Sequence, residues 1–138
     1  MSIRPEFAQA IVEGRKKVEF RKRPVAPDVS HVLIYATMPV GALVGWFAVD
    51  GQYTTEPKNL WRKFREDGAI SRTRFFEYYS NGSVGTGIRV GSVVRFESPL
   101  LLSWLDGVSR PPQSFQYLSE QQASEFFDSC VAEDLVTA

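Results

Sequence analysis

The chain has 138 residues, of which 43% are hydrophobic and 13% aromatic, a composition typical of one compact globular domain spanning residues 1–138. Sixteen basic and sixteen acidic residues give a formal net charge of zero. This balance argues against a protein that coats a long nucleic acid, so a nucleic-acid site has to be a local patch. The single cysteine, Cys130, excludes an internal disulfide and fits a reducing cytoplasm.

The sequence does not predict a zinc site, a membrane-spanning segment or a signal peptide. His31 and Cys130 are the only residues of their types, which is too few for a zinc site of the usual His/Cys kind within one chain. No apolar run reaches the roughly 18 residues of a membrane span, and the N-terminus lacks the apolar core of a signal peptide. We therefore expect a cytoplasmic protein with no membrane association, no metal and no cofactor.

The first half of the chain predicts a short helix and three strands. Residues 4–14 read as a helix with Pro5 in its first turn and Gly14 at its end. Residues 17–21 alternate, which places Val18 and Phe20 on a buried face and the charged residues between them on an outward face. Residues 31–37 and 42–50 are longer strands with few charges, and "DGQ" closes the second of them.

The second half predicts helices around a further stretch of strand. Thr55 caps a helix through residues 56–67, and Ser71 starts a short helix over residues 72–79. The glycine-rich residues 81–87 turn the chain into residues 88–102, read as two strands or one bent strand. Ser119 and Gln122 form a capping-box pattern at the start of an acidic C-terminal helix over about residues 119–134.

This order of elements indicates an α+β fold. Strands do not alternate regularly with long helices, which counts against a doubly wound parallel sheet. A small mixed or mostly antiparallel barrel or curved sheet, with short helices packed at its ends, fits the order better.

Positive charge is concentrated in residues 15–23, where six basic residues surround Glu19. One interpretation is a solvated strand face whose ion pairs contribute at most about 1 kcal/mol. The other is that Glu19 holds a neighbouring cation in place, while the remaining cations meet a phosphate, a base edge or a reacting carbonyl. A lysine crowded by cations can have a lowered pKa, which suits it to act as a base or nucleophile.

The same stretch carries a family resemblance. Gly14, Lys16, Glu19 and Arg21 fit the pattern G-x-K-x-x-E-x-R, and the chain thereby resembles the ASCH domain, a PUA-like family linked to RNA. The context is similar too, since "SIRPEFAQAI" precedes the motif and "VLIYATMPVGALVGWFAV" follows it. With "PPQSFQYLS" resembling the family's closing segment, the similarity covers roughly residues 2–118.

The resemblance implies a PUA-like β-barrel of five or six strands, with a cleft between barrel and helices along which the motif strand lies. Members are described as RNA- or nucleotide-binding. One bacterial subgroup hydrolyses N4-acetylcytidine with a Lys–Thr–Glu set; Lys16 aligns with its lysine, Glu19 stands where its threonine is, and its glutamate has no assigned counterpart. Another member is reported as a ribonuclease, an activity for which a divalent metal would be considered.

Aromatic residues and one turn are weaker candidates. The aromatic residues of the segment 75–79 are more often core than base-stacking platforms, and Tyr78, at a helix end, is the best candidate for stacking. Tyr35 and Thr37 share a strand face, and the resemblance places their segment opposite the motif strand. The turn "GSVGTG" lacks the residues of a phosphate-binding loop. Ser114 has no histidine near it in sequence, which gives little support for a catalytic triad.

We interpret the chain as a domain that binds a modified base or short single-stranded RNA in a basic cleft. The candidate binding residues are Arg4, Lys16, Lys17, Glu19, Arg21, Tyr35, Thr37 and Tyr78. The alternative is a hydrolase, either a ribonuclease or an N4-acetylcytidine amidohydrolase, in which Lys16 and Glu19 are catalytic. A third hypothesis is that the acidic C-terminal segment binds a basic partner. The oligomeric state, a homodimer included, is left open.

Overall fold

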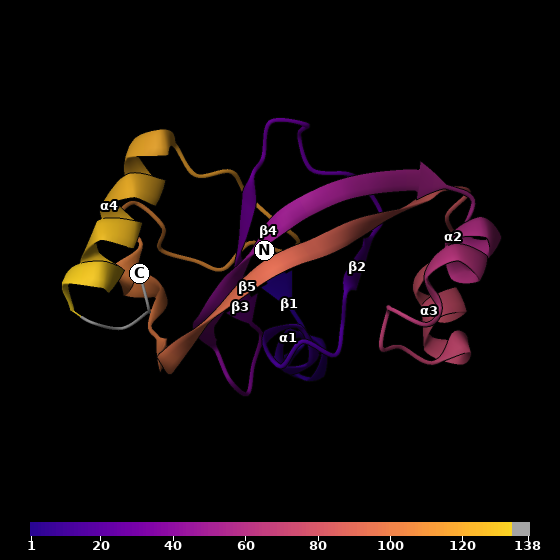
Figure 1. Cartoon of the computed structure of the whole chain (residues 1–138), viewed down its shortest axis with the longest axis horizontal. Coiled ribbons are helices and arrows are strands. Elements are labelled where there is room, and N and C mark those ends of the chain that lie inside the picture. Colours follow the sequence, from indigo (N-terminus) through magenta and orange to yellow (C-terminus); the bar gives the residue numbers. More distant parts are fainter. Residues whose placement is uncertain (134–138) are drawn as a thin grey trace.

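The computed structural model describes residues 1–133 as five strands with helices at both ends of a long curved sheet (Figure 1). The elements are β1 (Ser2–Ile3), α1 (Pro5–Val12), β2 (Val18–Arg21), β3 (His31–Ala36), β4 (Ala42–Thr55), α2 (Pro57–Phe64), α3 (Arg72–Tyr78), β5 (Gly85–Leu100), the 3-10 turn η1 (Leu102–Trp104) and α4 (Glu120–Ala132). Helices α2 and α3 lie at one end of the molecule and α4 at the other (Figure 1).

The strands form one mixed sheet in the order β1-β3-β4-β5-β2, which confirms the α+β class. All pairs are antiparallel except β1 with β3. The expected barrel does not close through strand pairing within residues 1–133, because β1 and β2 remain as the two edges. The sheet instead curves along its two longest strands, β4 and β5, which have 14 and 16 residues.

The length of β4 corrects one expectation, since "DGQ" does not end the strand. Gly51 has a φ of +98°, a conformation that glycine adopts without a steric penalty. The pairing with β5 shifts register across this point, between Val49 and Gln52, and then continues as far as Thr55. The glycine therefore forms an irregularity inside the strand. As a result, β4 extends far enough to carry α2 and α3 at its end.

Two of the three predicted N-caps, Ser71 and Ser119, are confirmed, whereas the predicted Thr55 cap is wrong. The Ser71 hydroxyl accepts from the backbone N–H of Arg74 at the start of α3. Ser119 and Gln122 form the expected capping box at the start of α4. The second helix begins one residue later than expected, with Glu56 at the N-cap position. The last residue of the predicted acidic helix, Asp134, lies outside the described residues.

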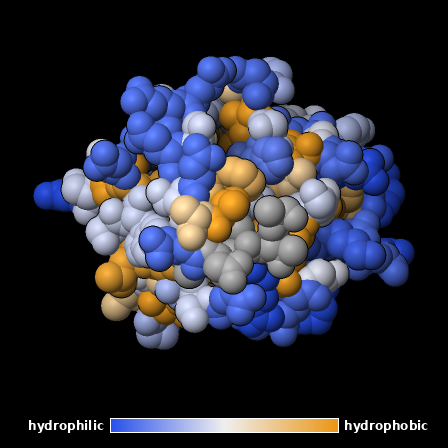
Figure 2. Space-filling model, turned by 60° about the vertical axis from the view of Figure 1, so that its left-hand side comes forward, coloured by the Kyte–Doolittle hydropathy of each residue, from blue (hydrophilic) through white to orange (hydrophobic). Residues whose placement is uncertain are grey.

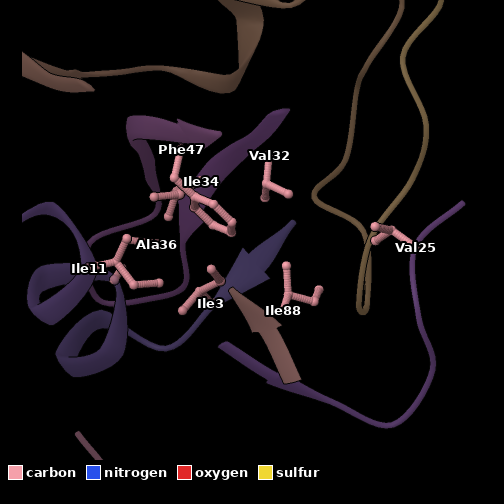
Figure 3. Packing of buried hydrophobic residues seen from close by; sticks show 9 residues of the cluster. Ile3, Ile11, Val25, Val32, Ile34, Ala36, Phe47 and Ile88 are labelled. Carbon is pink, nitrogen blue, oxygen red and sulfur yellow. The ribbon is translucent and has the colours of Figure 1, made fainter. Parts of the chain in front are cut away.

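Three apolar clusters hold the sheet and helices together. The first packs α1 under the sheet through Ile11, Ile34 and Phe47, all fully buried (Figure 3). The second joins β3, β4 and β5 to α4. The third packs α2 and α3 against β2, with Phe20 and Phe75 in edge contact at a ring-centroid distance of 4.8 Å. The third cluster matters most for function, because it positions α3 beside the charged strand.

The α4 end of the molecule retains apolar side chains at its surface. Figure 2, with this end turned forward, shows apolar areas among hydrophilic ones. On α4, Phe126 and Cys130 are buried, whereas Phe127 is 45% exposed. Across residues 1–133, no helix has the length and apolar character that a membrane span requires.

Candidate functional site: a basic pocket around Glu19

A pocket of about 770 Å³ lies beside β2, between α1, α3 and the segment 113–115. Six cationic and two acidic side chains line it: Arg4, Lys16, Arg21, Lys22, Arg23, Arg74, Glu19 and Glu77. A neutral protein thus gathers a clear excess of positive charge around one cavity. Such a local excess attracts anions even when the net charge of the whole chain is zero.

The inner part of the pocket is a buried charge cluster of three residues. Glu19 Oε2 lies 3.3 Å from Arg21 Nη1, and Glu19 Oε1 lies 3.8 Å from Lys16 Nζ. Their side chains are only 6%, 11% and 1% exposed, in the order Glu19, Arg21, Lys16. Buried charges are tolerated when they are paired, so each member of this cluster depends on the others.

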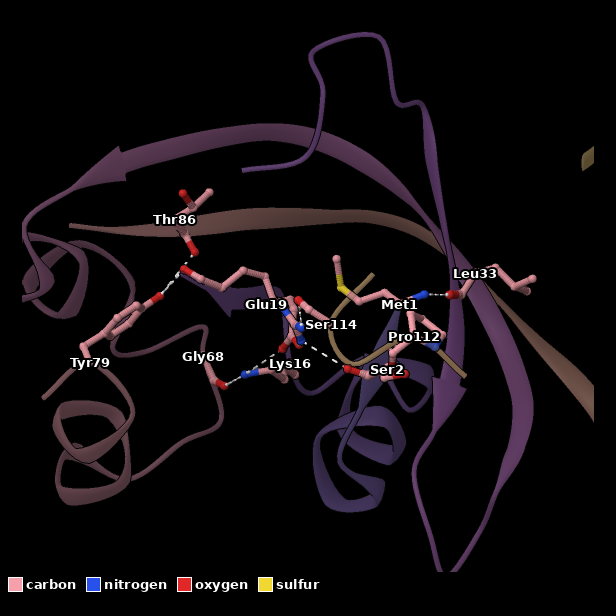
Figure 4. Close-up of polar contacts among 11 residues, drawn as sticks. Met1, Ser2, Lys16, Glu19, Leu33, Gly68, Tyr79, Thr86, Pro112 and Ser114 are labelled. Carbon is pink, nitrogen blue, oxygen red and sulfur yellow. Dashed lines mark hydrogen bonds and ion pairs between the residues drawn. The ribbon is translucent and has the colours of Figure 1, made fainter. Parts of the chain in front are cut away.

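Lys16 is enclosed on several sides. Its ammonium group donates to the carbonyl oxygen of Gly68 (Figure 4). The same group lies 4.8 Å from the ring centre of Phe7 and 5.2 Å from that of Phe20. Burial lowers the pKa of Lys16 below its ordinary value, and the carboxylate of Glu19 opposes this shift. The lysine therefore neutralises Glu19 while releasing its proton more readily than an exposed lysine.

Arg21 connects the charged strand to a distant segment of the chain. Its Nη2 donates to Ser114 Oγ at 2.5 Å, and its Nη1 donates to the carbonyl oxygen of Ser2 at 3.2 Å. Ser2 also holds that segment, since its backbone N–H donates to the Ser114 carbonyl at 2.8 Å and its hydroxyl donates to the Pro112 carbonyl at 2.5 Å. These bonds form one wall of the pocket.

Helix α3 supplies the opposite side of the mouth. Arg74 donates to Glu6 on α1 at 2.8 Å and lies over the ring of Phe7 at 4.8 Å. Lys22 lies 5.1 Å from the ring centre of Tyr78, which is 37% exposed at the end of the helix. Its neighbour Tyr79 is buried and donates its hydroxyl to the carbonyl of Arg21 at 2.7 Å. Of the two tyrosines, Tyr78 is thus the one that can meet a ligand.

Six of the eight candidate binding residues line this pocket. They are Arg4, Lys16, Glu19, Arg21, Thr37 and Tyr78. The other two lie elsewhere, which corrects the expected site. Lys17 is exposed outside the pocket, with its backbone paired to Asp67 and Val90. Tyr35 packs in the second apolar cluster and lines a different, largely apolar pocket of about 780 Å³ near α4.

Tyr35 and Thr37 separate because strand alternation stops between them. Strand β3 ends at Ala36, the residue between them. Thr37 then bonds to Ile3 through its backbone N–H and turns toward the pocket. A two-residue spacing places side chains on one face only while the strand stays regular.

The charged face of β2 is not the solvated surface that alternation suggested. Glu19 is 4% exposed, as buried as its apolar neighbours Val18 and Phe20. The fully solvated interpretation is therefore wrong, because α3 and the segment 112–115 cover this face.

The remaining lining side chains were not singled out as site residues from the sequence: Phe7, Lys22, Arg23, Arg74, Glu77, Gln113, Ser114 and Phe115, together with Ser2, Phe20 and Ile70. Only Lys22 and Arg23 carried a signal, as members of the basic run.

Comparison with known proteins identifies the family. The sequence model of the ASCH domain matches residues 1–99. The chain belongs to the ASCH domain family. This ASCH domain is 30% identical over 132 residues to a Zymomonas mobilis protein named "ASCH domain-containing ribonuclease", an alignment covering 91% of this chain and 86% of that protein.

Solved structures agree with this assignment. The crystal structure of the ASCH protein from Zymomonas mobilis superposes with a TM-score of 0.84 at 26% identity, over 99% of this chain and 94% of that one. The ASCH domain is also 27% identical over 119 residues to a large ribosomal subunit protein, uL22, of Ureaplasma parvum, covering 86% of this chain but 38% of that protein. The family thus has the fold of this chain.

No cluster of metal-ligating residues accompanies the site. Within residues 1–133, no three His, Cys, Asp or Glu side chains come together in a way that could hold a metal ion. The pocket's own side chains offer charge attraction, hydrogen bonding and proton transfer by a lysine whose pKa is lowered by burial.

Proposed function

We propose that this ASCH domain binds single-stranded RNA, with one nucleotide held in the basic pocket. The observation that carries the proposal is the convergence of six cationic side chains on one cavity that also has a partly exposed tyrosine at its mouth. Cations bind the phosphate backbone, and an aromatic ring stacks on an unpaired base. Because the whole chain is neutral, a nucleotide or short strand fits better than a long duplex.

Burial divides five of the six cationic residues into two groups, and the sixth, Arg74, is paired with Glu6. Lys16 and Arg21 are nearly enclosed and already face Glu19, so they hold the inner wall. Arg4, Lys22 and Arg23 are exposed at the mouth and are the side chains that reach phosphate. An RNA ligand also fits the cytoplasmic location expected from the single cysteine.

Exchanging both Lys22 and Arg23 for alanine should weaken the binding of a fluorescent single-stranded RNA about tenfold. It should also reduce the slope of log affinity against log salt by about 0.7 for each phosphate that the variant no longer neutralises. Fluorescence anisotropy over a salt series measures both quantities. The matched control is Lys58→Ala with Arg62→Ala, which removes two exposed cations of α2 outside the pocket. Equal losses of affinity in both double variants, or no RNA binding by the unaltered protein, would contradict the proposal.

A second candidate function is RNA cleavage. Two observations favour it: a relative of 30% identity is named a ribonuclease, and the pKa of Lys16 beside the pocket is lowered by burial. In its neutral form Lys16 would take the proton of a ribose 2′-hydroxyl as that oxygen bonds to the neighbouring phosphorus and the bond from phosphorus to the 5′-oxygen breaks. The leaving 5′-oxygen takes a proton from water, so the products are a 2′,3′-cyclic phosphate and a 5′-hydroxyl. The cations around the pocket would stabilise the negative charge that develops on the phosphate oxygens.

For this candidate, we expect labelled single-stranded RNA to be cut into shorter products. Lys16→Met should lower the cleavage rate by at least about 100-fold, as loss of a general base does. Glu97→Gln, at an exposed acid outside the pocket, should leave the rate nearly unchanged. Gel electrophoresis of the RNA, with and without Mn²⁺, detects a ribonuclease. A parallel incubation with N4-acetylcytidine detects an amidohydrolase. No turnover of either substrate would leave RNA binding as the function.

A further inference from the structure

The carboxylate of Glu19 forms part of the pocket wall, even though the pocket as a whole is basic. Glu19 lines the pocket, and its side chain is 6% exposed. Arg21 Nη1 lies 3.3 Å from Oε2. Among residues 1–133, Oε1 pairs with Lys16 Nζ at 3.8 Å, which is an ion-pair distance beyond hydrogen-bond reach.

Lys16 directs its hydrogen bond to another acceptor. Its ammonium group donates to the Gly68 carbonyl, and the rings of Phe7 and Phe20 flank it. A carboxylate has about four acceptor positions, and a buried acceptor is stabilised when hydrogen-bond donors reach it. Glu19 Oε1 therefore retains acceptor capacity at the wall of a cavity large enough for a nucleotide.

The distribution of charge sets the direction in which a nucleotide enters. The exposed cations Arg4, Lys22 and Arg23 at the mouth attract a phosphate group, whereas the inner cations Lys16 and Arg21 are already paired with the Glu19 carboxylate. The base is the part of the nucleotide that carries N–H donors. The base thus points inward toward Glu19 and the phosphate outward, with the ring of Tyr78 available for stacking.

We propose that Glu19 selects the base: the pocket prefers nucleotides with an exocyclic amino group, guanine foremost, over uracil. This inference rests on the proposed RNA binding. Guanine presents an N1–H and an N2 amino group side by side, which two carboxylate oxygens can accept together, and cytosine presents its N4 amino group. Uracil presents one N3–H between two carbonyl oxygens, and these oxygens face a carboxylate unfavourably.

The test uses the unaltered protein and four fluorescent RNA pentamers that differ only in the central base: UUGUU, UUCUU, UUIUU with inosine, and UUUUU. Anisotropy titrations on ice with EDTA give their affinities. We expect UUGUU to bind about tenfold more tightly than UUUUU, since a hydrogen bond to a charged group contributes that much. Inosine keeps N1–H but lacks the N2 amino group, so UUIUU should bind more weakly than UUGUU.

Glu19→Gln provides a second measurement, because glutamine has one acceptor where glutamate has two. The preference of this variant for UUGUU over UUUUU should fall to about twofold or less, whereas Glu97→Gln, at an exposed acid outside the pocket, should keep it. The pentamer series on the unaltered protein decides the question even if Glu19→Gln folds poorly. Equal affinity for all four pentamers would overturn the base selection while leaving RNA binding intact. Binding of none of them would overturn the proposed function itself.

Discussion

Replacing Glu19 with alanine should lower the free energy of unfolding by about 3–5 kcal/mol, the loss expected when one partner of a buried ion pair is removed. The change leaves two cations, Lys16 and Arg21, in the interior without their anion. Lys16 is the more affected of the two, because its side chain is only 1% exposed and burial already lowers its pKa. Urea unfolding followed by far-UV circular dichroism measures the difference.

The control for this prediction is Glu77→Ala. Glu77 is an acid in the wall of the same pocket, but it is exposed, so its loss should change the free energy of unfolding by no more than about 0.5 kcal/mol. A loss below about 1 kcal/mol for Glu19→Ala would mean that water or a rearranged side chain neutralises the two cations. The charge cluster would then contribute little to folding.

Phe75→Ala should lower the free energy of unfolding by a similar amount, about 3–5 kcal/mol, because of lost packing rather than lost charge pairing. Phe75 is fully buried in the third apolar cluster. Its ring centre lies 4.8 Å from that of Phe20, 5.0 Å from that of Tyr79 and 5.3 Å from that of Trp61. Removing the ring leaves a cavity between α2, α3 and β2 that neighbouring rings cannot fill without leaving their own positions.

Urea unfolding monitored by circular dichroism and by tryptophan fluorescence tests this prediction, since Trp61 adjoins the substituted ring. Thr73→Ala is the control on the same helix, because Thr73 is exposed and alanine is a good helix former. A loss under about 1.5 kcal/mol for Phe75→Ala would contradict the role given to this ring. It would show that α3 is held mainly by its polar contacts, such as the bond between Arg74 and Glu6.

The two predictions concern neighbouring residues of β2 and the side chains that each of them contacts. Phe20 and Glu19 are neighbours on β2; Phe20 packs against Phe75, and Glu19 faces the pocket. Helix α3 is held by the apolar cluster and in turn carries Arg74 and Tyr78 to the pocket mouth. The cost of burying three charged side chains is thus offset by a large aromatic cluster next to them.

Local features of the molecule could be predicted from the sequence because they depend on neighbouring residues. The caps at Ser71 and Ser119 involve atoms three residues apart, so their signal lies within a single turn of helix. Alternation predicted that Glu19 and Arg21 share a strand face, and the motif of the ASCH resemblance added Lys16. A bend followed by a short strand does bring the three together. The α+β class followed from the order of these local elements.

What covers each surface was decided only by the tertiary structure. Alternation in β2 separates two faces of a strand, but it carries no information about whether a helix or a distant segment packs on the polar one. Ser114 reaches Arg21 across 93 residues of sequence, a proximity that only the folded chain creates. Lys17 and Tyr35 lie outside the pocket for a similar reason. Lys17 precedes the first residue of β2, and β3 ends between Tyr35 and Thr37, so regular alternation does not align these side chains with those of the pocket. The sequence alone determined which charges are near one another along the chain, whereas packing of α3 and the segment 112–115 decided that these charges are buried and face a pocket.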